Sequence, residues 1–146
     1  MYTILKAVAA AATPTAYPFT YARKDFANLY DEIEVAALPH IFLDTVQVSE
    51  AYDNYDNLIE KTYTGSFMIV VSSDVDEDDY NTRYTNRIKP ILDATVDEIR
   101  IALHVQDWIK INSWVITEVI NIFDYGFDGV LIDFNIVEDT QRTVAQ

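Results

Sequence analysis

Hydrophobic and polar positions alternate most regularly near the C-terminal end of the chain, over VLIDFNIVE. Alternate positions of one parity are apolar, which is the period of a strand with one buried face. The preceding stretch WVITEVINIF predicts another strand, and the connecting DYGFDG contains two glycines. We therefore expect these strands to form a hairpin. The positions predicted to face inward are Val130, Ile132, Phe134 and Ile136.

Two further strands are predicted in the first half of the chain. HIFLDTVQV follows Pro39 and is rich in β-branched and aromatic residues. Its aliphatic residues occupy odd-numbered positions up to Leu43 and even-numbered positions from Val46. A bulge, or burial on both faces of the strand, would explain this change. TYTGSFMIVV predicts the second strand. The polar stretch SEAYDNYDNLIE between them is interpreted as a connector.

Helical spacing occurs in three places. TILKAVAAAA predicts a short helix that Pro14 ends. The aromatic-rich AYPFTYARKDFANLYDEIE is compatible with one or two further turns. From about Asp79 a long apolar stripe predicts a helix that reaches Leu103, and Pro90 either kinks it or begins a second helix.

The order helix, strand, strand, helix, strand, strand predicts an α+β fold. We expect a four-stranded, mainly antiparallel sheet that helices cover on one face. The chain has 146 residues, half of them hydrophobic, which suits a single domain with a sizeable core. We assign residues 1–138 to that domain and expect 139–146 to form a flexible C-terminal tail, because DTQRTVAQ lacks apolar periodicity.

Charge and cysteine content exclude or disfavour several classes of function. The chain carries 24 acidic and 10 basic residues, a net charge of -14, so it would repel a phosphate backbone. It has no cysteine, which excludes disulfides, thiolate metal sites and a cysteine nucleophile. We expect no membrane association, because no apolar run approaches the length of a bilayer span. The Ala-rich opening is interpreted as a helix and not a signal peptide, because Lys6 interrupts its apolar stretch.

Catalytic motifs are absent from the sequence. There are two histidines, His40 and His104, and neither GxSxG nor HExxH occurs. Three glycines in the whole chain do not form a phosphate-binding loop. We therefore expect a protein that is not an enzyme and that has no catalytic residue, metal or cofactor.

The acidic stretch SSDVDEDDYN is the densest group of candidate site residues. An EF-hand loop is disfavoured, because Asp79 stands where glycine is needed and Thr85 where a bidentate Glu is needed. Asp78 or Asp79 is instead predicted to cap the long helix. The surplus acids are expected to face solvent, a neighbouring subunit or a channel, with Arg83 and Arg87 as complementary charges. The acidic candidates are Asp74, Asp76, Glu77, Asp78 and Asp79.

Aromatic residues supply a second group of candidates, Tyr17, Phe19 and Tyr21. Tyrosine and phenylalanine in extended segments provide contact area at low entropic cost and are enriched at protein interfaces. Packing within their own domain is the alternative, and the sequence leaves both open.

Several phrases in this order resemble a known family: FTYARKDFANLYDE, LPHIFLDTVQV and GSFMIVVSSDVDED, followed by a long helix and a hairpin. The chain resembles the small neck, or tail-completion, proteins of tailed bacteriophages, in particular the Bacteroidetes-infecting, crAss-like type. The related tail-terminator proteins have a similar order of helices and strands. The similarity extends over about residues 1–138 and includes no catalytic motif.

The resemblance implies a structural virion protein in the neck or tail region, assembled in the host cytoplasm. It implies a six- or twelve-fold homo-oligomeric ring that contacts portal, connector or tail proteins and passes DNA without binding it specifically. A negatively charged channel would not retain the genome. Two alternatives remain: a small acidic protein-binding module that mimics nucleic acid, and a calcium-dependent adhesion or regulatory domain.

Overall fold

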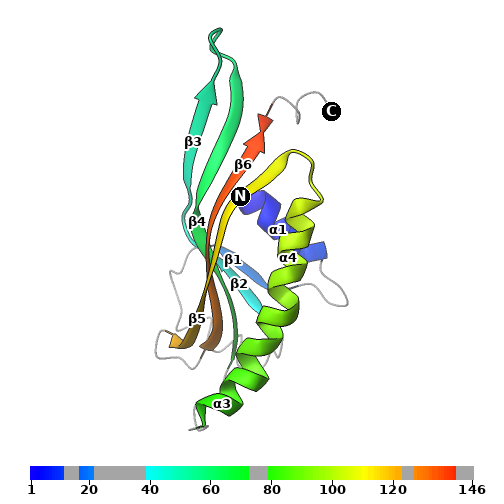
Figure 1. Cartoon of the computed structure of the whole chain (residues 1–146), viewed down its shortest axis with the longest axis vertical. Coiled ribbons are helices and arrows are strands. Elements are labelled where there is room, and N and C mark those ends of the chain that lie inside the picture. The colour runs from blue at the N-terminus through cyan, green and yellow to red at the C-terminus, as the bar shows by residue number, and fades with distance from the viewer. Residues whose placement is uncertain (12–16, 22–38, 73–78, 123–126, 141–146) are drawn as a thin grey trace.

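The computed structural model describes residues 1–11, 17–21, 39–72, 79–122 and 127–140. These residues form an α+β fold in which a mixed six-stranded sheet packs against two helices (Figure 1). The strands are β1 (Phe19–Tyr21), β2 (His40–Leu43), β3 (Gln47–Tyr52), β4 (Leu58–Ser72), β5 (Ile109–Ile122) and β6 (Phe127–Asp139). The helical elements are α1 (Tyr2–Ala11), α3 (Tyr80–Arg83), η1 (Tyr84–Ile88), η2 (Ile91–Thr95) and α4 (Val96–His104).

β4 is the central strand of the sheet. The strand order is β1-β2-β4-β6-β5, and β3 also pairs with β4. On one side β4 pairs with β6 along its length, and on the other side it pairs first with β3 and then with β2. All of these pairs are antiparallel, whereas β1 and β2 are parallel. β5 therefore lies at one edge of the sheet, and β1 and β3 lie at the other.

The prediction of four strands is wrong, because the described residues contain six. HIFLDTVQV forms two strands, β2 and β3, and the break at residues 44–46 explains the change of apolar parity. Phe19–Tyr21 forms a further strand, β1, which the sequence did not predict. The predicted connector is a hairpin of β3 and β4 that projects beyond the body of the molecule (Figure 1).

A side chain forms the turn of this β3–β4 hairpin. The Asp53 Oδ1 atom accepts hydrogen bonds from the backbone N–H groups of Tyr55 (2.8 Å) and Asn57 (3.0 Å). Asp56 has a φ of 63°, a left-handed conformation that Asp tolerates better than most residues. The hairpin is largely exposed and therefore lacks the buried apolar rows by which a strand is usually recognised.

The C-terminal pair of strands agrees with the prediction. β5 and β6 are antiparallel neighbours, and the predicted inward positions of β6 are buried. The connecting residues 123–126 lie outside the described residues. β6 also extends one residue beyond the predicted domain end, since Asp139 pairs with Glu60. Thr140 follows and donates a hydrogen bond to the Leu58 carbonyl, so the predicted tail boundary at 139 is too early. Residues 141–146 lie outside the described residues.

The long helix is continuous from Tyr80 to His104. Its two π-helical turns, η1 and η2, lie on either side of Pro90, which has no N–H to donate. Within these turns, N–H groups bond five residues back, as from Lys89 to the Tyr84 carbonyl. The wider turns keep the helix intact, so Pro90 does not begin a second helix.

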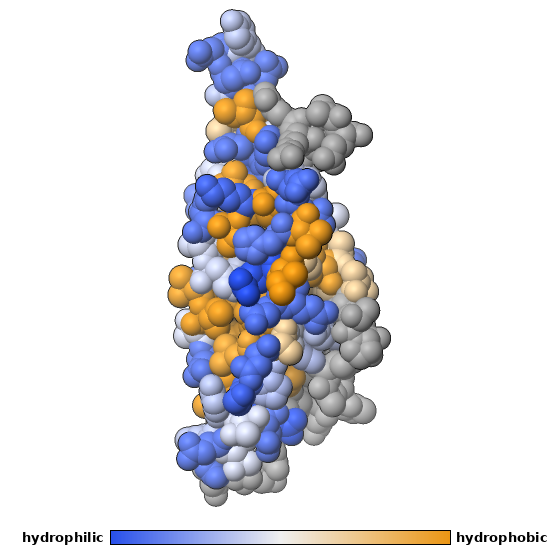
Figure 2. Space-filling view, turned by 45° about the vertical axis from the view of Figure 1, so that its right-hand side comes forward, coloured by the Kyte–Doolittle hydropathy of each residue, from blue (hydrophilic) through white to orange (hydrophobic). Residues whose placement is uncertain are grey.

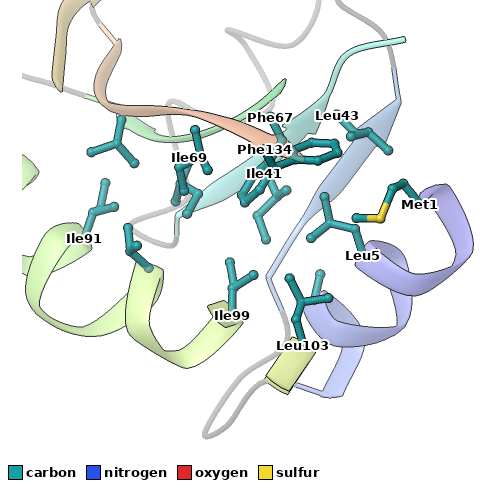
Figure 3. Packing of buried hydrophobic residues seen from close by; sticks show 14 of the residues in the cluster. Met1, Leu5, Ile41, Leu43, Phe67, Ile69, Ile91, Ile99, Leu103 and Phe134 are labelled. Atoms are coloured by element: carbon teal, nitrogen blue, oxygen red, sulfur yellow. The ribbon is translucent and has the colours of Figure 1, made fainter. Parts of the chain in front are cut away.

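The main core lies between the sheet and the two helices (Figure 3). Leu5 of α1 and Ile99 and Leu103 of α4 point toward Ile41 of β2 and Phe134 of β6, and all five are buried. A second, smaller cluster occupies the opposite face of the sheet. It consists of Phe42, Met68, Val70 and Phe127, so the central strands are buried on both faces.

Candidate functional site

Asp79 caps the long helix, as one of the two predicted alternatives. Its carboxylate accepts hydrogen bonds from the Asn81 N–H at 3.0 Å and the Thr82 hydroxyl at 2.8 Å. These bonds, the one from Thr82 first, hold the pKa of Asp79 below its usual value. Four other acidic candidates lie outside the described residues: Asp74, Asp76, Glu77 and Asp78.

Arg83 is a structural residue and not the surface charge that the sequence predicts. Its side chain is 3% exposed, and that of Asp128 on β6 is 0% exposed. The guanidinium donates from Nε to Asp128 Oδ2 at 3.0 Å and from Nη2 to Oδ1 at 2.7 Å. This two-pronged ion pair fixes the start of the long helix on the sheet. Arg87, one turn further, is half-buried.

The three aromatic candidates have different environments. Tyr17 is half-buried, and its hydroxyl donates to Glu98 Oε2 on α4 at 2.7 Å. Burial, and then this bond to a carboxylate, raise the pKa of Tyr17. Phe19 packs against the main core, whereas Tyr21 is 49% exposed. The structure thus places Tyr17 and Phe19 largely inside the domain and Tyr21 at its surface.

Tyr21 belongs to an exposed depression that we name the aromatic bowl. The bowl has a volume of about 430 Å³ and lies where β1 and the base of β3 meet α1. Its walls are almost entirely apolar or aromatic. They consist of Met1, Tyr2, Tyr21, Leu43, Val46, Val48 and Tyr63.

Two aromatic contacts shape the bowl. The Tyr2 ring meets those of Phe19 and Tyr21 edge-on, each with a centroid distance of 5.5 Å. The Lys6 ammonium lies 5.4 Å from the centre of the Tyr2 ring, which places a positive charge at the rim. Within the wall, Tyr63 donates to Glu138 Oε2 at 2.6 Å, and burial is the main reason that the pKa of Tyr63 is raised.

A second candidate surface lies at the other end of the sheet. We name residues 115–120 the β5 edge. The residues of this segment are exposed or half-buried on both faces of the sheet, and among the described residues β5 pairs only with β6. Val115, Ile116 and Ile120 are 54%, 41% and 41% exposed, and Glu118 is the only charge among them.

The β3–β4 hairpin is the third exposed feature. Its tip carries Tyr55, which is 85% exposed, and Tyr52, which is 55% exposed and donates its hydroxyl to Glu50. Figure 2 shows that this projecting end is mostly hydrophilic, whereas apolar side chains reach the surface of the body below it. The tip therefore offers a polar contact surface.

The two histidines have different environments. His40 is buried, stacks on Phe42 and shares a 2.7 Å hydrogen bond between its Nε2 and the Thr20 hydroxyl. Burial lowers the pKa of His40 to about 4. His104 is exposed at the end of α4. Within the described ranges, no three His, Asp or Glu side chains gather as metal ligands, and no helix is long and apolar enough to cross a membrane.

A groove of about 440 Å³ separates α1 from α4. Alanine, isoleucine, valine and tryptophan side chains form most of its lining, including Ala7, Ala102 and Ile99. Its carboxylate, Glu98, already accepts the hydrogen bond from Tyr17. The lining of the groove is therefore mainly apolar, and its carboxylate has a partner within the domain.

The sequence did not reveal most of the residues that form these surfaces. Tyr2 directly precedes a segment predicted as a helix, and Val48 lies in one predicted as a strand. Nothing in their spacing brings them together. The β5 edge was predicted as a strand, but its position in the sheet depends on a strand order that the sequence does not specify. Adjacent β-branched residues at 115 and 116 were the available signal that both faces are apolar.

A scan against protein-family models found none that matches this chain, and a search of curated proteins found none with significant similarity.

Proposed function

We propose that this chain is a structural protein that assembles into a ring in the head-to-tail connector, or as the tail terminator, of a tailed bacteriophage. The ring has six or twelve subunits, and its neighbours are portal, connector or tail proteins. The protein acts through its surfaces and is not an enzyme. The resemblance in element order and sequence phrases supports a role in a tailed bacteriophage. The exposed surfaces of the structure support assembly into a ring.

The exposed β5 edge carries this proposal. A strand of 14 residues ends the sheet without a proline or glycine, and its central part is exposed on both faces. Soluble monomers usually protect such an edge with charges, prolines or a covering segment, because it attracts further strands. Here one glutamate lies among three exposed aliphatic side chains. An assembly that covers this edge would remove its apolar surface from water.

The proposal also includes passage of DNA through the ring without specific binding, and the net charge supports this. A ring multiplies the charge of -14 by the number of its subunits. Negative charge on the inner wall would repel the phosphate backbone and let DNA pass without being held.

Native mass spectrometry and negative-stain images of the purified protein test this proposal. We expect closed particles of six or twelve copies, and we expect the chain among the structural proteins of purified phage particles that encode it. A protein that stays monomeric at every concentration and is missing from the particles would contradict the proposal. Capture of a basic nucleic-acid-binding protein by such a monomer would favour the mimic instead.

A further inference from the structure

We infer that the aromatic bowl of one copy receives the β5 edge of the next, so that the sheet continues from subunit to subunit. This inference rests on the proposed ring and names the contact that would close it. The occupant of the bowl is therefore a second copy of this chain.

The two surfaces lie at opposite ends of one sheet. The bowl includes Tyr21 of β1 and Val48 of β3, which form one border of the sheet, and β5 forms the other. A pair of different surfaces at opposite ends makes a head-to-tail contact, which forms a ring when its rotation closes. A contact of the β5 edge with itself would stop at a dimer.

The strand directions favour this contact. β3 is antiparallel to β4, β4 to β6, and β6 to β5, so β3 and β5 run in opposite directions. A second copy placed beside the first in the same orientation brings its β1 level with the β5 edge and its β3 level with residues 109–113 of β5, both as antiparallel neighbours. Among the described residues, β3 pairs only with β4, so its other side has backbone groups available for such a ladder.

The side chains are complementary in kind. The bowl is lined by tyrosine, valine and leucine, and the β5 edge presents Val115, Ile116 and Ile120. Interfaces that bury aromatic side chains against aliphatic ones gain most of their stability from that burial. Each surface would thus cover the exposed apolar side chains of the other.

The charges are complementary as well, and they lie on the same face of the sheet. Glu118 pairs with Val130 and Ile116 with Ile132, and both partners face the helices. Lys6 belongs to α1, which covers this same face, and lies over Tyr2 at the rim of the bowl. A neighbouring copy would therefore bring the single carboxylate of its β5 edge to the side of the bowl that carries an ammonium group.

Two blocking substitutions test the contact. Ile116→Arg places a charge on the β5 edge, and Val48→Arg places one in the bowl, and both sites are partly exposed, so folding is expected to survive. Ile101→Arg is the matched control, since this α4 residue is 56% exposed and belongs to neither surface. Circular dichroism and thermal melting verify the fold of each variant.

We expect Ile116→Arg and Val48→Arg to be monomers when alone, with association weakened by about tenfold or more, and Ile101→Arg to assemble like the parent protein. An equal mixture of the two blocked variants should give a 1:1 heterodimer by native mass spectrometry, because each retains the surface that the other lacks. A dimer of Val48→Arg alone would show a β5-to-β5 contact and overturn the inference.

Charge exchange provides a second measurement. Lys6→Glu should weaken assembly, and adding Glu118→Lys to it should restore assembly toward the level of the parent protein. If the parent forms rings that none of these substitutions weakens, the inference is wrong and the proposed function stands. If the parent forms no assembly at all, both are wrong.

Discussion

His40 shows what burial does to a single titratable group. The side chain is 6% exposed, and its folded-state pKa of about 4 lies well below the usual 6.5. The folded protein therefore keeps the neutral imidazole, which bonds to the Thr20 hydroxyl, while the unfolded chain takes up a proton near pH 6.5. Its contribution to stability is complete above pH 6.5 and is lost as the pH falls toward 4.

From this we predict that the free energy of unfolding falls between about pH 6.5 and pH 5 by up to about 1.4 kcal/mol per pH unit. Denaturant titrations at several pH values measure this slope. His40→Gln should flatten it, because the substitution removes the buried imidazole. An unchanged slope in His40→Gln would show that other groups cause the pH dependence.

The buried Arg83–Asp128 ion pair leads to a second prediction, about the free energy of unfolding. Arg83→Met leaves the Asp128 carboxylate, which is fully buried, without its cation, and we expect a loss of about 3–5 kcal/mol in unfolding free energy. Chemical denaturation measures the loss. The double variant with Asp128→Leu should recover much of it, because it removes both buried charges. A loss below about 1 kcal/mol for Arg83→Met would mean that Asp128 is held by other groups.

The sequence could not predict this pair, for a physical reason. Arginine is rarely buried, so a helical Arg83 is predicted at the surface unless its partner is known. That partner lies 45 residues away on β6, and Asp128 stands in a segment predicted as a turn. The sequence spacing carries no information about a contact of this range.

At the scale of elements, the helix N-terminus provides the next prediction. Asp79→Ala removes the acceptor for the Asn81 N–H and the Thr82 hydroxyl, so the first turn should open more often. Hydrogen exchange of the first-turn amides should become about fivefold faster, while the amides of α4 keep their rates. Asp79→Ser, which can still cap the helix, is the matched control. Equal exchange in both variants would argue against the cap.

The elements that the sequence predicted well are those with a single buried face. β6 alternates because one side packs on the helices, and the long helix shows a stripe because one side packs on the sheet. β3 was missed because its polar residues are exposed and need no apolar rows. β1 was missed because three residues are too short for a period to be detected.

At the scale of the whole molecule, net charge opposes self-association. Each copy carries -14, and one exposed ion pair at each contact, such as the one proposed between Lys6 and Glu118, contributes little by comparison. We therefore predict that assembly strengthens as salt rises from about 10 mM to about 150 mM, where the screening length falls from about 30 Å to about 8 Å. Sedimentation velocity at a fixed protein concentration measures this change. Weaker assembly in salt would show that attraction between charges dominates the contact.

The surfaces proposed for assembly were the least predictable part of the molecule. The sequence indicated Tyr21 as an interface candidate, but Tyr2, Val48 and Ile116 acquire their positions from the strand order. The acidic candidates from Asp74 to Asp78 remain a prediction, because they lie outside the described residues. Surfaces built from several distant segments are properties of the topology, and a local pattern does not encode them.

β4 has a mechanical consequence. Its 15 residues extend over roughly 50 Å, from the projecting hairpin into the middle of the sheet. Thirteen of them pair in register with β6. A force applied to the hairpin along the strand axis would load this ladder in shear, so that many hydrogen bonds must break together. The hairpin would then behave as a stiff lever that transmits a pull on its tip to the core.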